Sequence, residues 1–82
     1  MEIQRERFVI ITSDNKKIFC GRARSYEFRK ITDLRNIAVT TYESEARARA
    51  SFIRSWLYGE ALLEDNKVKI VKVRETFDFI DF

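Results

Sequence analysis

The chain contains no proline and only two glycines, Gly21 and Gly59, among its 82 residues. Proline and glycine interrupt helices and strands and mark flexible linkers, and an average chain of this length would contain about four prolines. Their scarcity predicts regular elements joined by tight turns, with no linker between separate domains. Because one domain usually takes roughly 100–200 residues, we expect residues 1–82 to form a single domain.

The first third of the sequence is typical of β-strands. Residues 7–12 are mostly β-branched or aromatic, and residues 13–16 are of the types that form a hairpin turn. Ile18 begins a second strand, which Gly21 interrupts as a β-bulge would, and residues 22–30 are expected to continue it in an extended conformation. One face of that extension would then carry Arg24, Tyr26, Phe28 and Lys30.

Residues 41–58 carry the clearest helix signal. Thr41 is suited to the N-cap, acidic residues follow in the first turn, and Gly59 is placed to end the helix in a left-handed conformation. At about 100° per residue, one stripe of this helix gathers small and apolar side chains: Tyr42, Ala46, Ala50, Ile53 and Leu57. We expect this stripe to face a sheet, with Trp56 at its edge and Arg47 and Arg54 on its flank.

Two more strands are predicted, at residues 37–40 and 68–74, and another helical turn within residues 60–66, anchored by Leu62 or Leu63. In the last strand the apolar residues change face between Ile70 and Val71. Either both faces of the sheet are partly covered there, or a β-bulge separates the two residues.

This order of strand, strand, strand, helix and strand predicts an α+β fold. Strands that follow one another closely pair in hairpins, so the default is a mainly antiparallel sheet of about four strands with one helix packed on one face. A single helix covers only one face of such a sheet. We therefore expect the other face to be solvated or covered by something else, and to leave arginines and aromatic rings available to another molecule.

The composition argues against an enzyme. There is no histidine and only one cysteine, Cys20, so a Ser-His or Cys-His pair and a structural zinc site are excluded. Carboxylate pairs such as Glu43 with Glu45 lie at a helix start, in a loop or at a terminus, where they are expected to be solvated. We predict no catalytic residue, no metal site and no cofactor, and we expect Cys20 to be a small core residue.

Positive charge is concentrated in one part of the chain. The net charge is only +3, but residues 16–35 hold seven basic residues against two acidic ones, and the last eight residues hold three acidic residues and no basic one. Such a basic segment attracts phosphates or an acidic protein surface. The alternative is that these charges only solvate the outer side of strands, or that the acidic tail neutralises them.

The basic and aromatic residues of this segment and of the helix are the predicted partner-binding site: Arg22, Arg24, Tyr26, Arg29, Arg47 and Arg54. Arginine and tyrosine are enriched at protein interfaces. Two alternatives stay open. The same basic strand interleaves bases with aromatics, as nucleic-acid-binding sheets do, and the apolar residues 77–82 could join two copies of the chain as an edge strand.

Several segments follow one another in a characteristic order along the chain. They are an opening hairpin, the turn at Thr32 and Asp33, the strand end and acidic helix start at residues 38–46, and a last strand at 68–73. This layout resembles small proteins encoded by phages and prophages of Gram-positive bacteria, most of which have no assigned function. The resemblance implies a mobile-element accessory protein that acts inside a bacterial cell. With no signal peptide and no apolar run near the roughly twenty residues of a membrane helix, we expect a cytoplasmic location.

The leading hypothesis is therefore a non-enzymatic binding module. It would occupy a surface of a host protein or protein–nucleic-acid complex, for example a CRISPR-type defence complex or a nucleic-acid-handling complex, as an accessory or inhibitor protein. Direct nucleic-acid binding and self-association are the alternatives.

Overall fold

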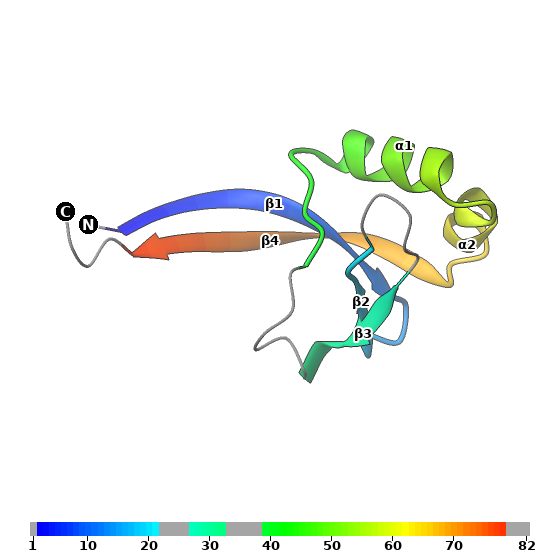
Figure 1. Cartoon of the computed structure of the whole chain (residues 1–82), viewed down its shortest axis with the longest axis horizontal. Coiled ribbons are helices and arrows are strands. Elements are labelled where there is room, and N and C mark those ends of the chain that lie inside the picture. The colour runs from blue at the N-terminus through cyan, green and yellow to red at the C-terminus, as the bar shows by residue number, and fades with distance from the viewer. Residues whose placement is uncertain (1, 22–26, 33–38, 79–82) are drawn as a thin grey trace.

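The computed structural model describes residues 2–21, 27–32 and 39–78 (Figure 1). Its elements in chain order are β1 (Glu2–Thr12), β2 (Lys17–Phe19), β3 (Phe28–Lys30), α1 (Glu45–Ser55), α2 (Gly59–Glu64) and β4 (Val68–Asp78). The strands form one antiparallel sheet in the order β3-β2-β1-β4. The α+β prediction is confirmed, and the helical layer consists of two short helices packed on the sheet.

The turn between β1 and β2 forms where the sequence predicted it. Asn15 has a φ of 63°, a left-handed conformation that asparagine tolerates. The Thr12 hydroxyl donates to the Asp14 carboxylate over 2.6 Å, and the Lys16 backbone N–H donates to the same carboxylate over 3.0 Å. These two hydrogen bonds lower the pKa of Asp14 and hold the hairpin closed.

The prediction that residues 22–30 continue the strand of Ile18 beyond an interruption at Gly21 is wrong. β2 ends at Phe19, and β3 returns antiparallel to it with Ile18 opposite Arg29. The Cys20 backbone N–H donates to the Glu27 carbonyl over 2.8 Å. Folding back in this way gives β2 a hydrogen-bonded partner on its second edge, which a single extended strand would lack.

The strand predicted at residues 37–40 is not present in its described part. Val39 and Thr40 belong to no strand, and residues 37 and 38 lie outside the described ranges. The nearest pairing is an isolated bridge between Tyr42 and Phe8. The chain before α1 therefore crosses the edge of β1 and does not add a full strand to the sheet.

β1 and β4 pair over their whole length, from Glu2 opposite Asp78 to Thr12 opposite Val68. The register runs on through Ile70 and Val71, so there is no bulge between them, and each residue packs on a different hydrophobic cluster. The alternative with both faces covered is thus confirmed. Beyond the globular part, residues 2–6 and 74–78 continue as a two-stranded ribbon, which we call the arm (Figure 1).

Hydrophobic clusters lie on both faces of the sheet. The helix-side cluster is centred on Ile10, Phe19, Phe52 and Val68. The cluster of the opposite face is centred on Val9, Ile11, Ile18 and Cys20, with Ile31 and Val39 packed against it. The sequence left the face without helices either solvated or covered by something else. In this region it is covered, since Val9 is 2% and Cys20 5% exposed, so it leaves no open surface there. Alternation along β1 turns successive apolar side chains to opposite faces, and both faces are covered.

The face that α1 buries differs from the predicted stripe. Ser44, not Thr41, is the N-cap, and its side chain accepts the Arg47 backbone N–H over 3.1 Å. The buried residues of α1 are Ala48 and Phe52, whereas Ala46 and Ala50 are exposed. The ring of Phe52 packs edge-on against Phe19 with the ring centroids 5.3 Å apart. Burial of this large ring decides which side of the helix faces the sheet.

The predicted helix end at Gly59 is also wrong. α1 ends at Ser55, its C-cap Trp56 is extended with φ −129°, and Gly59 begins α2. No glycine in the described ranges has a positive φ. A Cβ at Gly59 would lie 2.5 Å from the Phe52 carbonyl oxygen, so this glycine allows α2 to approach α1 closely. The helical turn predicted within residues 60–66 is confirmed, and Leu62 and Leu63 both pack against the helix-side cluster.

No helix in the part of the chain that the structure describes is long and apolar enough to cross a membrane.

Candidate partner-binding surface

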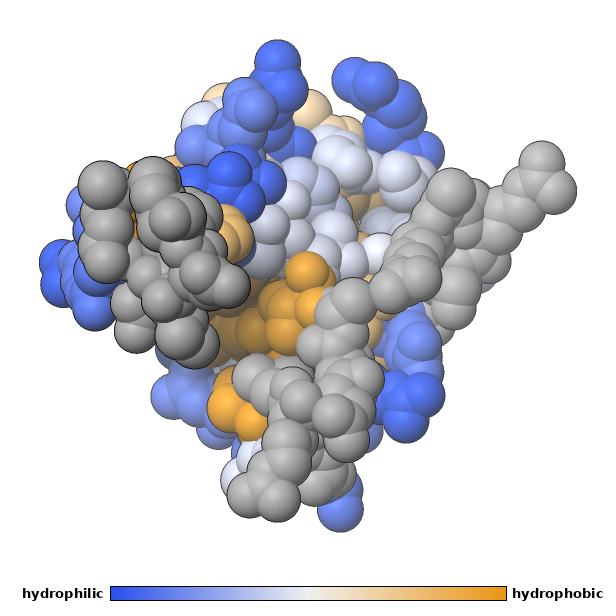
Figure 2. Space-filling model, turned by 60° about the vertical axis from the view of Figure 1, so that its left-hand side comes forward, coloured by the Kyte–Doolittle hydropathy of each residue, from blue (hydrophilic) through white to orange (hydrophobic). Residues whose placement is uncertain are grey.

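Large hydrophobic side chains are exposed at two places on the described surface. Ile3 and Phe77 face each other across the arm, and Leu57 and Tyr58 lie between α1 and α2. Figure 2 shows hydrophobic surface near the centre of one face of the molecule, with residues of intermediate hydropathy above it and hydrophilic side chains farther out. Exposed apolar side chains that lie together commonly mark interaction sites.

The helical corner, residues 56–58, is the more exposed of these two places. Leu57 is 89% and Tyr58 70% exposed, compared with 47% for Ile3 and 40% for Phe77. The preceding residue, Trp56, turns inward, and its ring lies 5.5 Å from the ring of Phe19. The corner is therefore anchored by Trp56 and carries its next two side chains on the outside.

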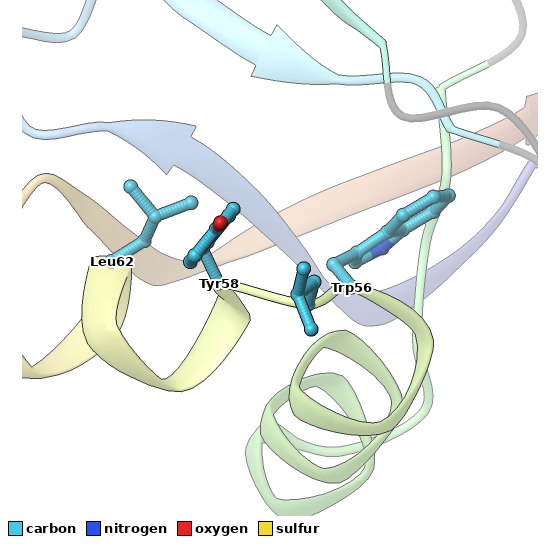
Figure 3. Close-up of a pocket in the computed structure, with 4 residues that line it drawn as sticks. Trp56, Tyr58 and Leu62 are labelled. Carbon is cyan, nitrogen blue, oxygen red and sulfur yellow. The ribbon is translucent and has the colours of Figure 1, made fainter.

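A hollow of about 500 Å³ lies at this corner, lined by Trp56, Leu57, Tyr58 and Leu62 (Figure 3). Its walls come from the end of α1, the short connection and the first turns of α2. The lining residues are two aromatic and two aliphatic, so the hollow suits an apolar side chain of a partner. The close approach of Gly59 to Phe52 positions α2, and with it Leu62, beside Trp56.

A second hollow, of about 450 Å³, lies along α1 and is basic. It is lined by Tyr42, Arg47, Ala50, Ser51 and Arg54. Arg47 lies 3.4 Å from the Glu43 carboxylate, and both side chains are mostly exposed. No ion pair of Arg54 is found among the residues that the structure describes. Two guanidinium groups at one hollow can bind a carboxylate or a phosphate group.

Tyr42 contributes a neutral hydroxyl to this basic hollow. Burial raises the pKa of Tyr42, and a hydrogen bond with the Ser51 side chain opposes that shift in part. The phenol therefore stays protonated at neutral pH beside the two arginines. Its position is set by the bridge to Phe8, in which each residue donates its backbone N–H to the other over 2.9 Å.

Two of the six predicted site residues come together in this hollow: Arg47 and Arg54. Arg29 is exposed on β3, pairs with Glu27 over 2.5 Å and does not line the hollow. The other three, Arg22, Arg24 and Tyr26, lie outside the described residues.

Sequence reasoning missed the exposed apolar corner, because it placed Leu57 on the buried stripe of the helix. If the buried stripe is centred on Phe52, the only phenylalanine of the helix, the sequence predicts that Leu57 faces outward. Phe52 is fully buried, while Leu57 is the most exposed large hydrophobic residue described.

The two alternative sites are only partly described. In the nucleic-acid alternative Phe28 would be a stacking residue, but its ring is half-buried and packs 5.3 Å from Phe19 in the helix-side cluster. In the self-association alternative Phe77 is exposed on the arm, and residues 79–82 lie outside the described ranges. Among the residues with a described placement, no three His, Cys, Asp or Glu side chains gather closely enough to hold a metal ion.

Comparisons of this chain with protein-family models, with curated proteins and with solved structures find no match.

Proposed function

We propose that this protein is a non-enzymatic binding module that docks on an acidic surface of a partner protein through the corner between α1 and α2. The observation that carries the proposal is the 89% exposure of Leu57 beside an apolar hollow of about 500 Å³. Burying one such side chain in an interface stabilises a complex by roughly 1.5–3 kcal/mol. Leu57 contributes almost no buried surface to the chain's own fold.

The charge of the partner is inferred from the neighbouring hollow. Arg47 and Arg54 project from the helix that leads into the corner, and both are exposed. A partner that fills the apolar hollow and carries carboxylates nearby would meet both features at once. Arginines at the rim of an interface chiefly raise the association rate and the specificity.

The resemblance of the sequence to phage and prophage proteins extends this proposal to a biological setting. In that setting the protein is an accessory or inhibitor in the bacterial cytoplasm. Its partner is a host protein or a protein–nucleic-acid complex, such as a CRISPR-type defence complex or a nucleic-acid-handling complex.

Affinity capture from a bacterial lysate with matched variants tests the proposed surface. Leu57→Asp should lose the captured partner, whereas Ile3→Asp, the same change at an exposed site on the arm, should retain it. Arg47→Glu with Arg54→Glu should also lose the partner. Arg49→Glu with Lys30→Glu changes the net charge equally at exposed positions outside the hollow and should retain it.

Two results would contradict the proposal. One is capture of the same partner by wild type and by Leu57→Asp, with circular dichroism showing both to be folded. The other is loss of the partner when the lysate is treated with nuclease, which would favour direct nucleic-acid binding. Binding to nucleic acid would also weaken steeply as salt is raised.

A further inference from the structure

β4 is an edge strand along the arm. It is the last strand in the sheet order, and within residues 2–21, 27–32 and 39–78 only β1 pairs with it. Figure 1 shows the arm extending away from both helices. The outer edge of such a strand presents backbone N–H and C=O groups that can pair with another strand.

The hydrogen bonds of β1 show which backbone N–H and C=O groups of β4 point to its outer edge. Phe8 makes both of its backbone hydrogen bonds with Tyr42, so its N–H and C=O point away from β4. Lys72 lies opposite Phe8 in the register and therefore directs its own N–H and C=O to the outer edge. By the alternation of an antiparallel pair, Arg74 and Thr76 do the same, while Val73 and Glu75 bond to β1.

The outer edge is also positively charged. Lys72 and Arg74 are exposed on one face of β4. Glu75 is held on the other face of the arm by Arg5, with Nη2 2.7 Å from Oε1. Glu6 of β1 lies opposite Arg74 in the register, and its carboxylate is 3.4 Å from the Lys72 ammonium group. A carboxylate on the adjacent strand β1, that of Glu6, thus already pairs with one of these basic residues, Lys72.

A second copy of the chain fits this edge poorly. If two β4 strands paired antiparallel over all eleven residues, Val73 would lie opposite Val73 of the second copy. Lys72 of each copy would then lie opposite Arg74 of the other. Like charges directly opposite one another destabilise a strand pair. An acidic strand avoids this repulsion and adds cross-strand ion pairs.

We infer that the outer edge of β4, at residues 72–76, binds an extended acidic segment of a partner protein as a fifth strand of the sheet. Backbone hydrogen bonds from Lys72, Arg74 and Thr76 hold the segment. Its carboxylates lie beside the cationic groups of Lys72 and Arg74. This edge lies on the arm and not at the helical corner, so the two surfaces can be tested separately.

Amide hydrogen exchange, measured by NMR, tests this inference with a short capped peptide in which glutamate and valine alternate. In the free protein the amides of Val71 and Val73 should exchange slowly and those of Lys72 and Arg74 quickly. The peptide should slow Lys72 and Arg74 by about tenfold, the effect expected for one added hydrogen bond, and leave Val71 and Val73 unchanged. The matched lysine–valine peptide should have no such effect.

Two variants separate the roles of charge and backbone. The variant with Lys72→Glu and Arg74→Glu should reverse the peptide preference: it should bind the lysine–valine peptide and no longer bind the glutamate–valine peptide. Arg74→Pro removes one outward N–H but keeps the ladder bonds to β1, which come from the alternate residues, and should lose peptide binding. Slow exchange at Val71 and Val73 reports that each variant keeps the β1–β4 pair.

The inference is overturned if the acidic peptide leaves the exchange of Lys72 and Arg74 unchanged, or if both peptides bind wild type equally well. Protection of Lys72 and Arg74 that rises with protein concentration in the absence of peptide would overturn it in favour of a second copy. Any of these results, with partner capture still dependent on Leu57, would leave the proposed function of the corner standing.

Discussion

Gly59 faces the backbone carbonyl of Phe52 so closely that a Cβ at Gly59 would lie 2.5 Å from the Phe52 oxygen. The neighbouring atoms belong to backbone, which cannot turn aside as a side chain can. This contact fixes α2 against the end of α1 and so builds the exposed corner between them.

We expect Gly59→Ala to destabilise the protein by about 1–3 kcal/mol. The higher helix propensity of alanine, worth up to about 1 kcal/mol, acts in the opposite direction but is smaller than the cost of the clash. Urea denaturation measures the difference, with Ser55→Ala at an exposed helix position as the control. Equal or greater stability of Gly59→Ala would show that α2 does not pack as described.

Phe52 and Leu57 should respond to truncation in opposite ways. Phe52 is fully buried, so Phe52→Ala should cost about 3–5 kcal/mol of unfolding free energy. Leu57 is 89% exposed, so Leu57→Ala should change it by less than about 0.5 kcal/mol. Denaturation of both variants checks which face of α1 is buried. A large loss for Leu57→Ala would support the stripe predicted from sequence instead.

The ion pair between Arg5 and Glu75 should contribute little to stability. Its N–O distance is 2.7 Å, but the two side chains are 53% and 30% exposed, and the Arg5 guanidinium also lies 5.0 Å from the centre of the Phe77 ring. A double-mutant cycle with Arg5→Met and Glu75→Gln should give a coupling below about 1 kcal/mol. The coupling should shrink as salt is raised. A larger, salt-independent value would contradict this.

Asp14 should make the hairpin sensitive to acid. Hydrogen bonds from the Thr12 hydroxyl and the Lys16 backbone N–H lower the pKa of Asp14. A pKa that is lower in the folded state stabilises the fold above the unfolded-state value, and this contribution is lost as pH falls through the folded-state pKa. Asp14→Asn should therefore be less stable than wild type at neutral pH, and the difference should narrow below about pH 4. If the stability difference between Asp14→Asn and wild type stayed constant over this pH range, the charge of Asp14 would not be what stabilises the hairpin.

Cys20 should react slowly with thiol reagents in the folded protein. The side chain is 5% exposed, and burial raises the pKa of its thiol. Alkylation at about pH 8 should be much slower in buffer than in denaturant, where the thiol has its ordinary pKa of about 8.5. Because folding favours the protonated thiol, stability should also decline as pH rises above that value. Equal labelling rates with and without denaturant would place Cys20 at the surface.

Local sequence signals predicted the structure correctly where it is stabilised by contacts between residues close in the chain. The turn at Asp14 and Asn15 is held by hydrogen bonds within a few residues, and the apolar run of residues 7–12 lies within β1. The change of face at Ile70 and Val71 indicated either two covered faces or a bulge, and the structure shows the first of these. In the candidate site, Arg47 and Arg54 could be placed together from helix periodicity alone.

The orientation of α1 and the course of the chain after Phe19 could not be read from local patterns. Alanine and leucine at helical spacing predicted one buried stripe, but Phe52 buries its ring against Phe19, a residue of another element. In the same way, the composition of residues 18–30 is compatible with one long strand. The return of β3 depends on its pairing with β2.

The sequence by itself determined the extended segments at residues 7–12 and 68–74, the turn between β1 and β2, and the helical character of residues 45–55. These features depend on side-chain shape and on hydrogen bonds between near neighbours. The tertiary structure decided which side chains remain outside, including Leu57 and Tyr58 at the corner and the outer edge of β4. Those outcomes depend on how helices and strands distant in the chain pack against one another, because that packing determines which surfaces of each element are buried and which stay exposed to solvent.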